Sequence, residues 1–114
     1  MKFFNKITGD KGEIIAQNHL KKNKFRILET NFRSKMGEID IIAQKKEQIV
    51  FIEVKTRESA EFGRPSEAVN SHKQWKIRKV AEEYLLKNKL TDYPCRFDVI
   101  EVLDDEINHI ENAF

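Results

Sequence analysis

Two neighbouring apolar segments of this chain carry charged residues where a buried strand would be apolar. Residues 37–43 read GEIDIIA and residues 49–57 read IVFIEVKTR, and their content of Ile, Val and Phe is typical of β-strands. The polar residues between them predict a hairpin. Burying a polar group without a partner costs roughly 2–7 kcal/mol. The charges of Asp40, Glu53 and Lys55 must therefore be balanced, and a metal ion is the leading candidate.

The register of this hairpin brings the two acids together. A turn centred on residues 45–48 pairs positions whose numbers sum to 93. Asp40 then faces Glu53, and Glu38 faces Lys55. The other face pairs Ile41 with Ile52, Ile39 with Val54, and Ala43 with Val50. A slip of one residue would reverse the two faces, so the apolar pattern determines the register.

Two opposed carboxylates repel each other unless a cation lies between them, because their Cβ atoms are about 4.5–5.5 Å apart. Gathered carboxylate oxygens suit Mg²⁺, which keeps several waters and prefers phosphate-rich substrates. The alternative is a surface ladder of ion pairs, in which Glu38 pairs with Lys55 while Asp40 and Glu53 are solvated. The pattern alone leaves both interpretations open.

The first predicted helix covers residues 11–22 and follows a loose basic arm at residues 1–8. Asp10 is a suitable N-cap, and Glu13 three residues later completes a capping box. Glu13 also lies at the end of the apolar stripe of this helix. It either folds back on its own helix or points towards the site, and the spacing does not separate these roles.

The second helix shows the clearest periodicity. Ser71 is the predicted cap, with Gln74 at the capping-box position. The buried stripe contains Ile77, Val80, Ala81, Tyr84 and Leu85. One turn earlier the stripe reaches Lys73, which either extends to solvent or lies at the edge of the site. The sequence assigns no role to His72 and Trp75, and a lone histidine is more often structural than catalytic.

Further strands are predicted at residues 25–33, 96–103 and 107–114. The order is then one helix, three strands, one helix and two strands. A helical connection between the third and fourth strands implies that these two are parallel. We therefore expect a single α/β domain over residues 1–114, with a mixed sheet of about five strands flanked by helices.

Three more charged residues are candidates for the site. Arg57 and Arg64 flank a polar loop and are expected either to contact phosphates or to be solvated. Asp98 lies in an apolar strand on the same face as Ile100 and Val102. We expect it to orient a basic neighbour rather than to bind metal.

Composition narrows the class of protein. Residues 1–35 hold nine Lys or Arg and three Asp or Glu, although the net charge of the whole chain is only +2. A basic region of this kind can attract a phosphate backbone, or it can be ordinary solvated surface. The single cysteine, Cys95, excludes an intrachain disulfide, which fits a cytoplasmic location. No segment has the ~20 apolar residues needed to cross a bilayer.

The charged hairpin resembles the PD-(D/E)xK nuclease superfamily. The resemblance lies in Asp40 at the end of one strand and in Glu53, Val54 and Lys55 on the next; Ile39 replaces the proline of the motif. The Holliday-junction-resolvase branch of that superfamily has a glutamate on its first helix, which matches Glu13. The resemblance implies a restriction-endonuclease-like fold.

A closer resemblance covers nearly the whole chain. Four ordered blocks are similar to the YraN-like family of small bacterial proteins. They are GEIDII from position 37, FIEVKTR from 51, GRPSEAV from 63 and RFDV from 96. That family is predicted to share the restriction-endonuclease-like fold, and its biological role is poorly defined. The resemblance therefore bears more on the fold than on the activity.

The resemblance implies roles for individual residues. Asp40 and Glu53 would bind Mg²⁺ or Mn²⁺, with the Val54 carbonyl as an extra ligand. Lys55 would orient the attacking water or stabilise charge on the phosphate, and Lys73 would be an auxiliary contact. Glu13 would add a ligand through water or act as a base, while Glu38 would be auxiliary.

We therefore expect a metal-dependent nuclease that acts on DNA, with both linear and branched DNA as candidate substrates. Many resolvase-like nucleases act as dimers, so a homodimer is one candidate assembly, although the sequence does not fix the oligomeric state. The alternative is a non-catalytic nucleic-acid-binding protein that keeps the nuclease fold. A third is a scaffold whose charged hairpin is an ion-pair network. Cleavage of linear and branched DNA in the presence of Mg²⁺ or Mn²⁺ would separate them.

Overall fold

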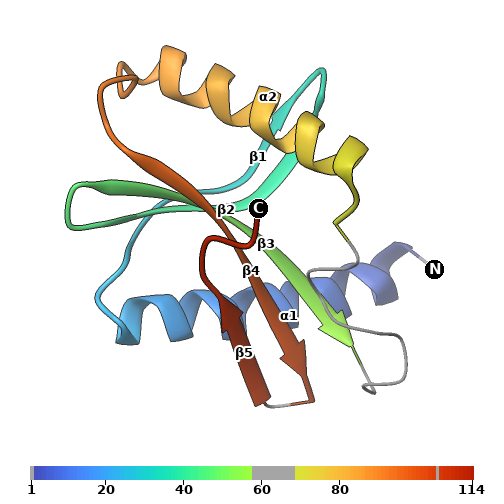
Figure 1. The fold of residues 1–114 in the computed structure, drawn as a ribbon. Coiled ribbons are helices and arrows are strands. Elements are labelled where there is room, and N and C mark those ends of the chain that lie inside the picture. The colour runs from blue at the N-terminus through green and yellow to red at the C-terminus, as the bar shows by residue number, and fades with distance from the viewer. Residues whose placement is uncertain (1, 58–68, 105) are drawn as a thin grey trace.

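A five-stranded mixed sheet lies between two helices in the computed structural model, which describes residues 2–57, 69–104 and 106–114 (Figure 1). The elements are α1 (Lys2–Lys22), β1 (Arg26–Ser34), β2 (Gly37–Lys45), β3 (Gln48–Arg57), α2 (Ser71–Lys87), β4 (Cys95–Leu103) and β5 (Glu106–Ile110). The strands are ordered β1-β2-β3-β4-β5, with β3 and β4 parallel and the other pairs antiparallel. The predicted α/β class, element order and parallel pair are confirmed.

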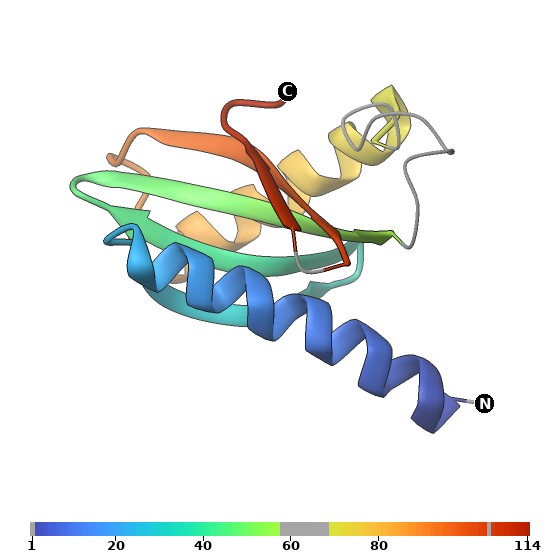
Figure 2. The same cartoon turned by 90° about the horizontal axis from the view of Figure 1, so that it is seen from below.

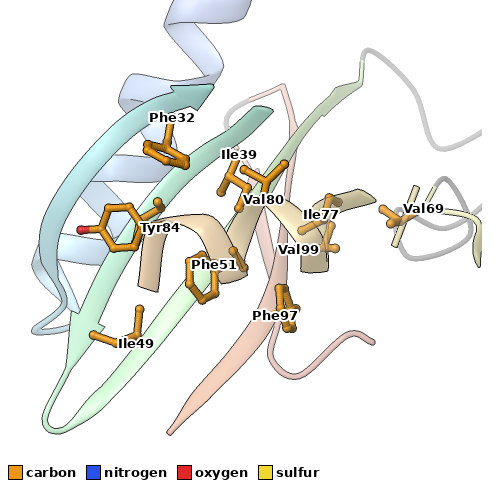
Figure 3. Packing of buried hydrophobic residues seen from close by; sticks show 12 residues of the cluster. Phe32, Ile39, Ile49, Phe51, Val69, Ile77, Val80, Tyr84, Phe97 and Val99 are labelled. Atoms are coloured by element: carbon orange, nitrogen blue, oxygen red, sulfur yellow. The ribbon is translucent and has the colours of Figure 1, made fainter. Parts of the chain in front are cut away.

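The two helices cover opposite faces of the sheet, as the view from below shows (Figure 2). The core under α2 joins the helix stripe to aromatic and aliphatic side chains of the sheet (Figure 3). Its buried members include Phe32, Ile42, Phe51, Ile77, Val80, Tyr84 and Phe97. The core under α1 includes Ala16, Leu20, Phe25, Ile41, Val50, Ile52 and Ile100. Neither described helix has the length and apolar content needed to cross a membrane.

The predicted register of the β2–β3 hairpin is confirmed over five pairs. They run from Lys45 with Gln48 to Ile41 with Ile52. Beyond this point the alternation of faces in β2 breaks, because Ile39 lies in the α2 core together with Ile42. The prediction that Ile39 shares a face with Ile41 and pairs with Val54 is therefore wrong.

A second irregularity lies beside this break, in the neighbouring strand. Asn31 of β1 has a positive φ of 53°. It stands across from Asp40, between the Thr30–Ile41 and Phe32–Ile39 pairs. A left-handed residue inside a strand kinks it and disturbs the local pairing. Asp40 therefore occupies an irregular position in the sheet rather than one step of a regular ladder.

Helix α1 starts much earlier than predicted. It begins at Lys2, so the loose arm at residues 1–8 and the N-cap at Asp10 are wrong. No proline interrupts this segment, and a formed helix extends by one hydrogen bond for each residue added. The capping-box role considered for Glu13 therefore does not apply, because Glu13 lies inside the helix.

Helix α2 is capped one residue before the predicted position. The side chain of Asn70, not that of Ser71, accepts a hydrogen bond from the backbone N–H of Lys73, with 2.9 Å between N and O. Asn and Ser are comparably good caps, so local chemistry did not separate them. Four residues of the predicted stripe are buried, and Leu85 is partly buried against them.

The C-terminal strand is shorter than expected, since β5 ends at Ile110 rather than continuing to Phe114. The chain turns there, and the backbone N–H of Ala113 donates to the carbonyl of Phe97 at 2.7 Å. This contact directs the end of the chain towards the α2 core, where Phe114 stacks on Phe97. Asp104, directly after β4, has a positive φ of 55°.

Helix α1 approaches the sheet very closely at Gly12. A Cβ atom on Gly12 would collide with Oγ1 of Thr56 on β3. The missing side chain of Gly12 leaves room for the Thr56 hydroxyl between helix and sheet. The contact holds α1 against the end of β3 that carries Glu53 and Lys55.

Candidate active site

Asp40 lies where β2 and β3 stop pairing. Its Oδ2 accepts a hydrogen bond from the backbone N–H of Val54, with 2.8 Å between N and O. The carboxylate thus replaces the backbone acceptor that a continued ladder would supply. Burial raises the pKa of Asp40, the bond from Val54 opposes this rise, and the charge of Glu38 adds to it. The acid reaches β3 through a backbone contact rather than as one member of a regular cross-strand pair.

Glu53 is buried beside Asp40, with 5% of its surface exposed. Its Oε2 lies 3.6 Å from Nζ of Lys73. Its Oε1 is buried and has no hydrogen-bond partner among the described residues. Burial and the charge of Asp40 raise the pKa of Glu53 to about 7, although Lys73 and Lys55 oppose them. The carboxylate is therefore held in place with one oxygen unsatisfied, which is costly for a buried group.

Two lysines meet at the same place from different elements. The pKa of the half-buried Lys55 is lowered, mainly by burial and then by the hydrogen bond with Lys73 and the charge of Lys73. Burial would also lower the pKa of Lys73, but the hydrogen bond with Lys55 and the attraction of Glu53 outweigh it and raise that pKa. The two amines therefore interact with each other and with the acids at one point. The Asn70 cap positions the first turn of α2, which carries Lys73.

These residues fit a divalent metal of the Mg²⁺ type. Mg²⁺ is commonly held by one or two carboxylates, with water and substrate phosphate completing its shell. Asp40 and Glu53 supply two carboxylates, and Oε1 of Glu53 has no competing partner among the described residues. Within those same residues, no three His, Cys, Asp or Glu side chains converge on one point. The two-carboxylate arrangement therefore suits an ion that keeps most of its waters.

Two other predicted acids lie around this cluster. Oε2 of Glu13 accepts a hydrogen bond from Nδ2 of Asn31, with 3.3 Å between the two atoms. Asn31 is the residue that lies across from Asp40. Glu38 forms an ion pair with Arg33 at 3.0 Å instead of the predicted cross-strand pair with Lys55. The structure thus places Glu13 against β1 and Glu38 at the edge of the cluster.

A groove of about 100 Å³ adjoins the cluster between α2 and the start of β2. It is lined by Met36, Gly37, Glu38, Lys73, Lys76, Ile77 and Val80. Lys76 lines this groove together with Lys73, although it was not among the predicted site residues. Their spacing of three residues, which places two side chains on neighbouring positions of a helix, was the available signal.

Two predicted phosphate contacts lie outside the part of the chain that the structure describes. Arg64 lies outside the described residues, as does the side chain of Arg57. Their proposed contacts with phosphate remain predictions from the sequence.

Asp98 is buried away from this cluster, in a network of its own. Its carboxylate accepts hydrogen bonds from Arg96 at 3.0 Å and from the backbone N–H of Asn112 at 2.9 Å. Nε2 of His109 lies 2.7 Å from the carboxylate, and Nδ1 of His109 lies 3.1 Å from Nε2 of His19. These surroundings are those of an acid that holds basic neighbours, the role favoured for Asp98 from the sequence.

Comparison with known proteins gives a family for this chain. The model of the uncharacterised protein family UPF0102 matches residues 12–102. A UPF0102 protein of Alkaliphilus oremlandii is 53% identical over 116 residues, which cover 96% of this chain and 99% of the relative. Another, from Caldanaerobacter subterraneus, is 53% identical over 122 residues and covers both chains completely. A third, from Clostridioides difficile, is 52% identical over 112 residues, covering 96% and 98%. The chain therefore belongs to the UPF0102 family, the YraN-like family that its sequence blocks resemble.

Proposed function

We propose that this protein is a metal-dependent nuclease that hydrolyses phosphodiester bonds in DNA. The observation that carries the proposal is the buried, unpartnered Oε1 of Glu53 beside Asp40, with two lysines at the same point. An unsatisfied buried acceptor is costly, and such atoms concentrate at functional sites. Two adjacent acids with amines beside them match the ligand and charge requirements of phosphodiester hydrolysis.

Each residue has a distinct task in this proposal. Asp40 and Glu53 hold the metal, which when bound polarises a phosphoryl oxygen and lowers the pKa of attached water. Lys55, two residues from Glu53 and so on the same face of β3, orients the attacking water or stabilises charge that develops on the phosphate. Lys73, whose pKa is raised, stays charged and stabilises the same negative charge. Attack by the water oxygen forms the new bond to phosphorus and breaks the bond to the leaving sugar oxygen, which takes up one proton while the water gives up one.

The test is cleavage of a panel of linear and branched DNAs with Mg²⁺, with Mn²⁺ and with EDTA. We expect metal-dependent cleavage that falls by at least about 100-fold in Glu53→Gln, the scale seen when a group that stabilises transition-state charge is removed. Glu47→Gln is the matched control, since it removes an exposed carboxylate at the far end of the same hairpin. Unchanged cleavage by Glu53→Gln would contradict the assignment of Glu53 to the nuclease site.

Binding of the panel without cleavage under any metal would favour the non-catalytic alternative. The presence of Lys55 and Lys73 beside both acids argues for catalysis, because a protein that only binds a phosphate backbone gains nothing from two neighbouring carboxylates, one buried and one half-buried. Like charges at the binding surface would repel the phosphates instead.

A further inference from the structure

An exposed pair of aromatic rings lies on the first turns of α2, beside the candidate active site. The rings of His72 and Trp75 are nearly parallel, with an angle of 12° and 6.4 Å between their centroids. Half of the surface of Trp75 is exposed, and His72 is exposed as well. Neither residue belongs to the buried stripe of α2, so core packing does not account for them.

Basic side chains connect this aromatic pair to the site. Nζ of Lys79 lies 5.7 Å from the centroid of the Trp75 indole, and it is also paired with Glu82 at 3.6 Å. Lys76 follows His72 by one helical turn and lines the groove that Lys73 shares. Lys73 in turn lies 3.6 Å from Glu53. A continuous surface of lysines and rings therefore leads away from the acids along α2.

We propose that His72 and Trp75 form a stacking platform for an unpaired base of the nucleic acid whose phosphate enters the Asp40–Glu53 site. Aromatic side chains flanked by cations are the general means of holding single-stranded nucleic acid, because every base has a flat face and every linkage a negative charge. The site then prefers strands with unpaired nucleotides, whereas a base pair inside a duplex keeps both faces covered by its neighbours. This inference rests on the proposed function, which identifies the ligand as a nucleic-acid strand.

The exposed indole of Trp75 is the larger ring of the platform and carries the stacking. An ammonium group already lies near it, since Nζ of Lys79 is 5.7 Å from the indole centroid. A base that stacks on the indole therefore lies beside a cation that can meet its phosphate.

Trp75 is the only tryptophan of the chain, so its fluorescence reports directly on the platform. The probes are a short single-stranded oligonucleotide and the blunt duplex of the same sequence, titrated first in EDTA and then with Ca²⁺. We expect the single strand to quench the fluorescence and the duplex to quench it much less. Absence of quenching by the single strand in both conditions would overturn the platform.

Labelled oligonucleotides measure the contribution of the ring. Trp75→Leu should weaken single-strand binding by about 10- to 100-fold, the expected scale for one stacked base, and should change duplex binding little. Trp75→Phe should retain most of the affinity. Tyr93→Leu is the matched control, since it removes an exposed aromatic ring outside α2. Equal losses for both nucleic acids, or no loss in Trp75→Leu, would contradict the proposal.

These measurements separate the platform from the nuclease activity. Binding in EDTA does not depend on hydrolysis, so stacking on Trp75 without any cleavage would contradict the nuclease proposal and support the platform. Cleavage that depends on Glu53, but is the same in Trp75 variants and on single and double strands, would support the nuclease and contradict the platform. Unfolding curves of the Trp75 variants should match the wild type, because the ring lies outside the core.

Discussion

Glu53 and Asp98 are both acids buried in the parallel pair of strands β3 and β4, and they differ in how their charge is satisfied. Burial would raise the pKa of Asp98, but bonds from His109, Arg96 and the backbone of Asn112 outweigh it and lower that pKa. Glu53 keeps an unpartnered oxygen, and its pKa rises to about 7. Burial alone therefore does not mark a functional acid. The unpartnered oxygen is what separates Glu53 from Asp98, because it leaves an acceptor that a ligand could use.

Removing the charge of Asp98 should have the largest effect on stability. Asp98→Asn leaves the guanidinium of Arg96 largely buried, and breaking a buried ion pair in this way costs about 3–5 kcal/mol. Urea unfolding at pH 7 measures the loss, with Asp92→Asn as an exposed control. A cost below about 1 kcal/mol would mean that Asp98 does not hold the network together.

The contribution of Asp98 has a definite pH dependence. Its folded pKa lies below the ordinary 3.8, so its stabilisation is present above that pH and is lost as the pH falls through the folded value. The difference between wild type and Asp98→Asn should therefore shrink in acid.

The second-largest effect on stability is expected from metal binding at Glu53. An ion that binds only the folded state at 100 times its dissociation constant stabilises by about 2.7 kcal/mol. We expect Mg²⁺ or Mn²⁺ to raise the free energy of unfolding of the wild type and of Glu47→Gln, measured by urea titration. Glu53→Gln should lose most of this gain. The same gain in Glu53→Gln would place any bound ion elsewhere.

The smallest effect concerns the metal-free protein. The folded pKa of Glu53 is raised above its ordinary 4.5, so its contribution to stability is lost as the pH rises through about 7. Glu53→Gln cannot ionise, and in EDTA at pH 8 it should be more stable than the wild type by about 1 kcal/mol. The gain should disappear near pH 5. A destabilised Glu53→Gln at pH 8 would show that the ionised carboxylate supports the fold.

Local patterns were enough to predict most of the architecture. The register of the β2–β3 hairpin followed from alternation within one short segment, and the stripe of α2 followed from its helical period. The same stripe, extended by one turn, led to Lys73 at the edge of the site. These features depend on neighbours in sequence, which the chain displays directly.

Features that need distant partners were not predicted. The break in β2 at Asp40 lies across from the left-handed Asn31, which belongs to another strand. The network around Asp98 joins side chains from β4, β5 and the following turn, together with His19 of α1. The aromatic pair on α2 gave only a weak signal, namely a histidine and a tryptophan three residues apart. Spacing alone does not tell whether such rings face solvent or core.

The contact between Gly12 and Thr56 makes one residue of α1 a spacer between helix and sheet. A methyl group at position 12 would meet the Thr56 hydroxyl. Either that hydroxyl turns away, or the helix moves outward and takes the adjacent Glu13 away from its bond to Asn31. Position 12 is therefore sensitive to substitution although it carries no polar group.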